Sequence, residues 1–201
     1  FAEAAKGAVA AGYRAVKLAP FDGVIAEDAA RTPIDARTRS GLDCVFAVRD
    51  AVGAEVPVMV DCHWRFDVER AERLLHDIAP ARPYWVVCMT SEHPACFPAV
   101  ARLTAIAHQA GMRTAGGETI AGADQATAMC AGKLYDVLMP DIKYAGGYSG
   151  MLAIADVCAA HGRDEIPPLP PPRRPPGHGP HLSAAHGRDE IPPLQPHSDP
   201  P

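Results

Sequence analysis

The sequence predicts an α/β fold in which helices cover a parallel sheet. Short apolar, β-branched runs alternate with longer amphipathic segments along the first 162 residues. Strands that alternate with helices pair in parallel, because each helix returns the chain to the same end of the sheet. A doubly wound sheet and a (β/α) barrel both fit this alternation. No Gly-x-Gly-x-x-Gly motif follows the first expected strand, so a dinucleotide-binding fold loses its best support.

Residues that start or stop helices set the bounds of the expected elements. Thr32 followed by Pro33 starts the second helix, and Asp67 is an N-cap for the third. Gly53 and Gly111 end the second and fourth helices. In chain order we expect helix 1–11, strand 13–18, helix 32–52, strand 56–60, helix 67–78, strand 84–89, helix 100–110, strand 112–115, helix 123–131, strand 136–139 and helix 150–160.

The end of the chain differs in composition from the rest. Residues 163–201 hold 13 of the 21 prolines and no Phe, Trp, Tyr or Cys. An eleven-residue sequence at 159–169 recurs at 184–194. Such a segment cannot bury enough apolar surface to offset the entropy lost on ordering. We therefore expect a folded domain over 1–162 and a disordered, proline-rich tail over 163–201.

Charge and hydropathy argue against several classes of protein. The net charge of −5 leaves no basic stripe for the phosphates of a nucleic acid. No apolar run reaches the roughly 18–20 residues of a membrane span, and no signal peptide opens the chain. The six cysteines form no Cys-x-x-Cys pair, which is typical of reduced cytosolic thiols. We expect a cytoplasmic protein with no nucleic-acid or membrane partner, and the opening Phe1 fits a fragment.

Polar residues follow the expected strands where barrel enzymes carry their reacting groups. Lys17 lies in the first strand, Asp61 and His63 follow the second, Glu118 follows the fourth and Asp141 the fifth. Carboxylates from separate strands that converge on one mouth suit a hard cation such as Mg²⁺. The alternatives are ordinary loop acids for Asp61 and Glu118 and a helix N-cap for Asp141. For His63 the alternative is a structural histidine, and for Lys17 it is a lysine that only pairs with carboxylates.

These motifs, in this order and spacing, resemble the enolase superfamily. The nearest group is the mandelate racemase and muconate lactonizing enzymes, especially their acid-sugar dehydratases. The resemblance covers residues 1 to about 162 and implies an incomplete (β/α) barrel of the enolase C-terminal type. It also implies a Mg²⁺ cofactor and a sugar-acid substrate that loses the proton α to its carboxylate and then water. The segments that carry it are Tyr13-Arg14-Ala15-Val16-Lys17, Val60-Asp61-Cys62-His63, Gly116-Gly117-Glu118-Thr119, Met139-Pro140-Asp141 and Gly146-Gly147.

Site roles carry over from the resemblance position by position. Asp61 resembles the first metal ligand and Glu118 the third. His63 resembles the histidine that serves some sugar-acid dehydratases as general acid. Asp141 resembles the aspartate that forms a base dyad with a histidine on the next strand, and Lys17 resembles the first lysine of a Lys-x-Lys pair.

The chain departs from the family pattern at two site positions. Val87 stands where the resemblance places the second metal ligand, a glutamate, and Ala19 stands at the second lysine position. The family's capping domain, first strand and last two strands lie outside the expected fold. The alternatives are therefore an inactive, truncated remnant and a racemase or epimerase of the same family. Open edges of an unclosed sheet favour association, so a homo-oligomer is also expected.

Overall fold

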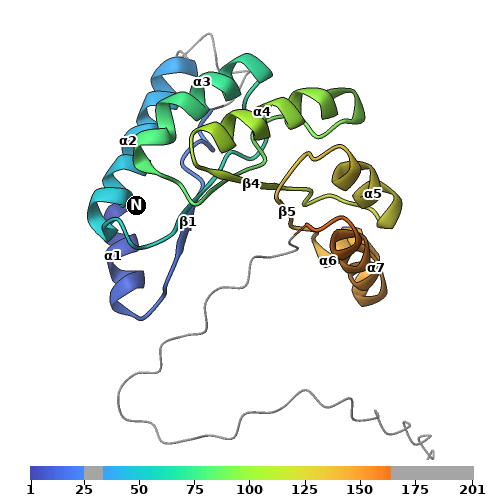
Figure 1. Cartoon of the computed structure of the whole chain (residues 1–201). Helices are drawn as coiled ribbons and strands as arrows, with labels where there is room; N and C mark the ends of the chain where they lie inside the picture. The colour runs from blue at the N-terminus through green and yellow to red at the C-terminus, as the bar shows by residue number, and fades with distance from the viewer. Residues whose placement is uncertain (25–33, 164–201) are drawn as a thin grey trace, which may run out of the picture. The chain divides into compact units, whose positions relative to one another are not determined.

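Five short strands form one parallel sheet in the computed structural model, which describes residues 1–24 and 34–163 (Figure 1). The sheet order β1-β2-β3-β4-β5 follows the chain, so each strand pairs with the strand before it. Four of the strands are shorter than the sequence predicts, and β4 has the predicted length but is shifted by one residue. Their bounds are β1 (Val16–Leu18), β2 (Val58–Asp61), β3 (Trp85–Val87), β4 (Arg113–Gly116) and β5 (Val137–Leu138).

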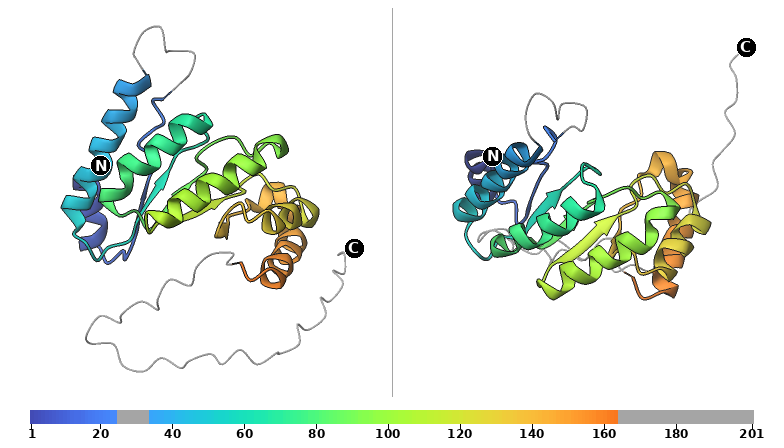
Figure 2. Two further views of the ribbon diagram at one scale, coloured as in Figure 1. Left: turned by 45° about the horizontal axis from the view of Figure 1, so that its top comes forward. Right: turned by 90° about the horizontal axis from the view of Figure 1, so that it is seen from above.

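Helices connect successive strands and lie along the outer face of the sheet (Figure 2). A doubly wound sheet would reverse its strand order and carry helices on both faces. The sequential order observed here is that of a (β/α) barrel, so the doubly wound alternative is wrong. The helices are α1 (Ala2–Ala10), α2 (Ile34–Val52), α3 (Val68–Ile78), α4 (Phe97–Gln109), α5 (Ala123–Ala131), α6 (Ile142–Ala145) and α7 (Gly147–Ala160), with 3-10 turns η2 (Ala79–Ala81) and η3 (Pro94–Cys96).

Local sequence signals account for several of these boundaries. Asp67 caps α3 as predicted, because its carboxylate accepts the Arg70 backbone N–H at 2.8 Å. Helix α5 has the predicted bounds, whereas α6 was not predicted. The predicted start of α2 at Thr32 and Pro33 lies outside the described residues. So does the predicted tail over 163–201, apart from its first residue.

The two faces of the sheet bury different side chains. Toward the helices, Val60 and Val86 join a core that also contains Leu74 and Leu75 of α3. On the opposite, inner face, a smaller cluster of Trp85, Val87, Cys88, Ala115 and Val137 gathers without a helix residue. Side chains alternate between faces along a strand, so Lys17, Met59 and Asp61 also belong to the inner face. The sheet thus presents two of the predicted site residues, Lys17 and Asp61, on the face away from the helices.

No helix among the described residues is both long enough and apolar enough to cross a membrane.

Candidate active site at the carboxyl end of the sheet

A lysine and two carboxylates meet at the carboxyl end of β1, β2 and β4. Asp61 is the last residue of β2, and its side chain is almost completely buried. The Lys17 ammonium of β1 lies 2.7 Å from Asp61 Oδ2 and 3.9 Å from Glu118 Oε1. Glu118 follows β4 after Gly117, which has a positive φ of 83° and turns the chain toward the site. The structure therefore brings these three predicted residues together around one ammonium group.

His63 joins the cluster through a strained turn after β2. His63 and Trp64 have positive φ angles of 45° and 55°, which side chains other than glycine rarely adopt. The His63 backbone N–H donates to Asp61 Oδ1 at 3.1 Å, and Nε2 of the ring lies 3.4 Å from Asp61 Oδ2. The other ring nitrogen, Nδ1, lies 2.6 Å from Oδ1 of Asp22. The turn thus holds the imidazole between two carboxylates.

The electrostatic balance at Glu118 is unfavourable to its ionised form. Burial raises the pKa of Glu118, and the negative charge of Asp61 raises it further. The positive charges of Lys17 and His63 lower the pKa, but not by enough to cancel the increase. An added cation at this place would relieve the repulsion between the two carboxylates.

Position 87 contributes no oxygen to the cluster. Val87 ends β3 on the inner face, in register with Asp61 on one side and Ala115 on the other, and it is fully buried. Cys62, next to Asp61, faces the core under the helices, where burial raises the pKa of its thiol. The pKa of Cys88 is also raised, mainly by burial. Both cysteines pack as apolar residues and supply no metal ligand here.

Asp141 lies beside the cluster and caps a helix. Its carboxylate accepts the Lys143 backbone N–H at 2.9 Å and lies 3.2 Å from the Lys143 ammonium, and these contacts lower its pKa. Its backbone N–H donates to the carbonyl oxygen of Glu118 at 3.0 Å. An open pocket is lined by Trp64, Glu118, Thr119, Met139, Asp141 and Tyr144. Asp141 therefore shares a pocket with Glu118, and the N-cap alternative describes its present contacts.

The donor set fits Mg²⁺ through two protein ligands. Within residues 1–24 and 34–163, no three His, Cys, Asp or Glu side chains are grouped to hold a metal ion. Asp61 and Glu118 nevertheless offer hard carboxylate oxygens on either side of one cation, the Lys17 ammonium. Mg²⁺ is commonly held by one or two carboxylates together with substrate and water. These two residues would hold the ion, and Lys17 occupies part of the same space.

Comparison with known proteins decides the family. The sequence matches the enolase C-terminal domain-like family over residues 1–191. The chain belongs to this family. The predicted resemblance and the barrel-type fold are thereby confirmed.

Relatives of this enolase-family chain include sugar-acid dehydratases. D-gluconate dehydratase of Thermoproteus tenax is 30% identical over 164 residues, which cover 80% of the chain and 30% of that protein. A crystal structure of a mandelate racemase/muconate lactonizing enzyme from Jannaschia sp. CCS1 is 28% identical, with a TM-score of 0.69, over 81% of this chain and 40% of that one. An L-talarate/galactarate dehydratase variant, solved with Mg and L-glucarate, is 25% identical with a TM-score of 0.65, over 81% and 36% of the two chains. The chain thus spans less than half the length of each.

Two further contributors to the site lie in loops: Asp22 was missed at the sequence level, whereas Glu92 stands shortly after the third expected strand in the sequence. Asp22 contacts His63 across 41 positions of sequence, from a loop after β1 that carries no motif. Glu92, five residues after Val87, accepts the Gly117 backbone N–H at 2.9 Å. Neither contact follows from strand periodicity, because both residues lie in connections between elements.

Proposed function

We propose that this chain carries the barrel-mouth part of a sugar-acid dehydratase, a carbon–oxygen lyase acting on a small-molecule carboxylate. The observation that supports it best is the convergence of Lys17, Asp61, His63 and Glu118 at one end of the sheet. Sugar-acid dehydratases among the relatives support the same class of reaction. The active sites of barrels lie at this end of the strands.

Each residue has one task in the proposed reaction. Asp61 and Glu118 would hold Mg²⁺, which, when bound, supplies positive charge against the negative charge that develops on the substrate carboxylate. Asp141 would take part in removing the α-proton, as the member of the base dyad that the resemblance implies. The electron pair of the broken C–H bond forms the new C=C bond as the β C–O bond breaks. His63 gives its proton to the departing hydroxyl, which leaves as water.

The surroundings of His63 suit an acid that must stay in place. Asp22 fixes one ring nitrogen at 2.6 Å, so the ring cannot rotate freely about its side-chain bonds. The other nitrogen faces Asp61, at the edge of the place where Mg²⁺ and substrate would meet. Proton transfer from such a fixed group typically contributes about 10²–10⁴-fold to rate.

The experiment is a screen of sugar acids with the full chain and Mg²⁺, read by mass spectrometry for loss of water. His63→Asn should reduce any turnover by about 10²-fold or more while leaving Mg²⁺-dependent stabilisation intact. The matched control is His76→Asn, since His76 is exposed on α3 and should leave turnover unchanged. Equal activity of the two variants would contradict the role of His63. Exchange of the α-proton with solvent without water loss would indicate the racemase or epimerase alternative.

A second candidate, a catalytically inactive relative, is favoured by one feature of the same site. Val87 gives the site no third carboxylate, and the Lys17 ammonium already neutralises Asp61 at 2.7 Å. For this candidate, no sugar acid loses water with the chain as it stands, and Val87→Glu alone strengthens Mg²⁺ binding. A melt with and without millimolar Mg²⁺ distinguishes the two, because a ligand at 100 times its Kd adds about 2.7 kcal/mol to the free energy of unfolding.

A further inference from the structure

Glu92 reaches from one strand end to the next. It lies in the connection between β3 and α4, just before η3. Its Oε1 accepts the backbone N–H of Gly117 at 2.9 Å and a weak hydrogen bond from Cys88 Sγ at 3.7 Å. Gly117 directly precedes Glu118. The Glu92 carboxylate therefore ties the end of β3 to the turn that carries a proposed Mg²⁺ ligand.

The neighbouring glycine leaves room for this carboxylate. A Cβ atom at Gly116 would lie 2.5 Å from Glu92 Oε1 and 2.4 Å from the ring of Tyr135, closer than real Cβ contacts allow. Gly116 is also in register with Leu138, whose side chain belongs to the core under α5 and α7. The Glu92 carboxylate therefore reaches β4 at Gly116, and its charge also raises the pKa of Glu118.

Two buried polar atoms mark the same place. Among the described residues, Glu92 Oε2 and the Tyr135 hydroxyl are both buried without a hydrogen-bond partner. Burial, and then the charge of Glu92, raises the pKa of Tyr135. The Tyr135 phenol therefore keeps its proton in the folded protein. A polar side chain that places an atom in such surroundings needs a reason beyond packing, because a buried polar atom without partners is costly.

We infer that Glu92 is a positioning residue for Glu118, because it holds the Gly117 amide and so sets where the next side chain points. The inference rests on the proposed role of Glu118 as a Mg²⁺ ligand. The Glu92 Oε1 accepts the Gly117 N–H, so this oxygen is not free to replace the carboxylate missing at position 87. Groups that orient metal ligands typically change metal affinity by about 10–100-fold when removed.

The test compares three variants of the full chain labelled with ¹⁵N-glycine. Glu92→Met keeps the length of the side chain and removes both acceptors, whereas Glu92→Gln keeps a carbonyl oxygen at Oε1. Glu72→Met is the matched control, because Glu72 pairs with Arg102 at 2.8 Å between α3 and α4, away from the site. Two quantities are measured: the exchange rate of the Gly117 amide proton, and the Kd of Mg²⁺ by titration calorimetry.

We expect E92M to speed exchange of the Gly117 amide about tenfold or more and to weaken Mg²⁺ binding about tenfold or more. E92Q and E72M should stay within about threefold of wild type in both measurements. Unchanged exchange and unchanged Kd in E92M would overturn the inference, and so would loss of stability without either change.

If E92M gives no cooperative melt, Glu92→Asp replaces it, because the shorter carboxylate no longer reaches the Gly117 N–H. If wild type binds no Mg²⁺, the proposed cofactor fails, and Gly117 exchange alone then decides whether Glu92 holds the turn.

Discussion

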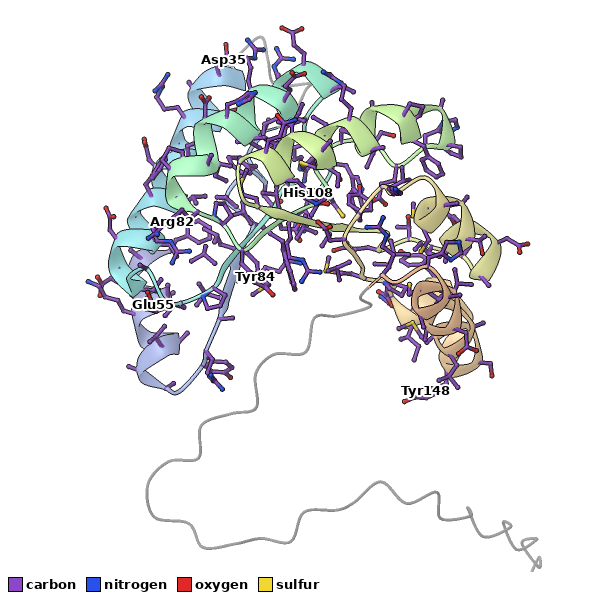
Figure 3. All side chains as sticks on the ribbon, viewed as in Figure 1. Asp35, Glu55, Arg82, Tyr84, His108 and Tyr148 are labelled. Atoms are coloured by element: carbon purple, nitrogen blue, oxygen red, sulfur yellow. The ribbon has the colours of Figure 1, made fainter. Side chains whose placement is uncertain are left out.

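Carboxylates at the two ends of the sheet have pKa values that are shifted in opposite directions. At the amino end, Asp136 precedes β5 and accepts the Thr114 backbone N–H at 2.8 Å. His108 lies on α4 (Figure 3). Its Nε2 is 2.9 Å from both carboxylate oxygens of Asp136. Burial raises the pKa of Asp136, but the hydrogen bonds from His108 and Thr114 outweigh it, so the pKa is lowered. This carboxylate is more stable ionised in the folded protein than in water.

At the carboxyl end, burial and a like charge have the larger effect on the carboxyl pKa. The pKa of Glu118 is raised by burial and by Asp61, although Lys17 and His63 lie nearby. The opposite shifts agree with a stabilising role for Asp136 and with the ligand site proposed around Glu118. A carboxylate saturated with donors binds nothing further, whereas one held close to another carboxylate gains from an added cation. The difference agrees with barrels in general, where function lies at the carboxyl end.

The largest expected effect comes from adding a third carboxylate at the carboxyl end. Val87→Glu places an ionisable group on the fully buried inner face beside Asp61. Without Mg²⁺ we expect the free energy of unfolding to fall by roughly 3 kcal/mol or more, since the new charge has no partner. Millimolar Mg²⁺ should recover much of that loss. Urea unfolding with and without Mg²⁺ measures both effects.

The control for this change is the adjacent residue on the other face. Val86 is equally buried, but it packs in the core under the helices. Val86→Glu should destabilise the protein to a similar extent and gain nothing from Mg²⁺. Recovery of both variants by Mg²⁺, or of neither, would contradict the assignment of the inner face as the metal-binding face.

The sequence predicted the arrangement of the sheet because alternation and periodicity are local signals. The alternating runs predicted the five strands in order, and period-two alternation within β1 and β2 puts Lys17 and Asp61 on one face. The short helix α6 was missed, because its four residues show too little periodicity between Pro140 and Gly146. The bounds of the strands were predicted less well: β1, β3 and β5 are shorter than predicted, whereas β2 and β4 each end one residue later.

The site could be predicted only in part, for a similar reason. Asp61 and Glu118 follow strands, so their convergence follows from the fold. The contact of His63 with Asp22 depends on how a loop folds back over the strand end, and no sequence pattern encodes it. The role of Lys17 between two carboxylates also required distances, because pairing and catalysis need the same residue type at the same position.

The next largest effect is expected from removing the lysine ammonium at the carboxyl end. Lys17→Met removes the ammonium that contacts Asp61 and Glu118. We expect the Kd of Mg²⁺ to fall about tenfold, which corresponds to about 1.4 kcal/mol of binding free energy. The reason is that the ion no longer competes with the lysine ammonium for the two carboxylates. Lys143→Met is the control, since this exposed lysine pairs with Asp141 instead. Weaker Mg²⁺ binding by K17M in calorimetry would show that Lys17 supports the metal site.

A smaller effect is expected at the amino end, with a defined pH dependence. A lowered carboxylate pKa in the folded state stabilises the protein above the unfolded pKa of about 3.9, and this stability is lost as pH falls through the folded value. Asp136→Asn should cost about 1 kcal/mol at pH 7 and progressively less below pH 4. Urea midpoints between pH 7 and pH 3 measure the difference. A cost that persists at low pH would assign the role of Asp136 to packing.

Glu118→Gln should have the smallest effect and the opposite sign. A raised carboxylate pKa means that the folded state binds its proton more tightly, so stability increases as pH falls through the folded value. At pH 7 without Mg²⁺, removing this charge should therefore raise the free energy of unfolding, by less than about 1 kcal/mol because the side chain is partly exposed. This gain in the free energy of unfolding should vanish at low pH, where wild-type Glu118 is protonated. With Mg²⁺ the sign should reverse, because the ion stabilises only the protein that binds it. A lower melting temperature for E118Q without Mg²⁺ would place Glu118 with Asp136 among the carboxylates that stabilise the fold, and the contrast between the two ends would fail.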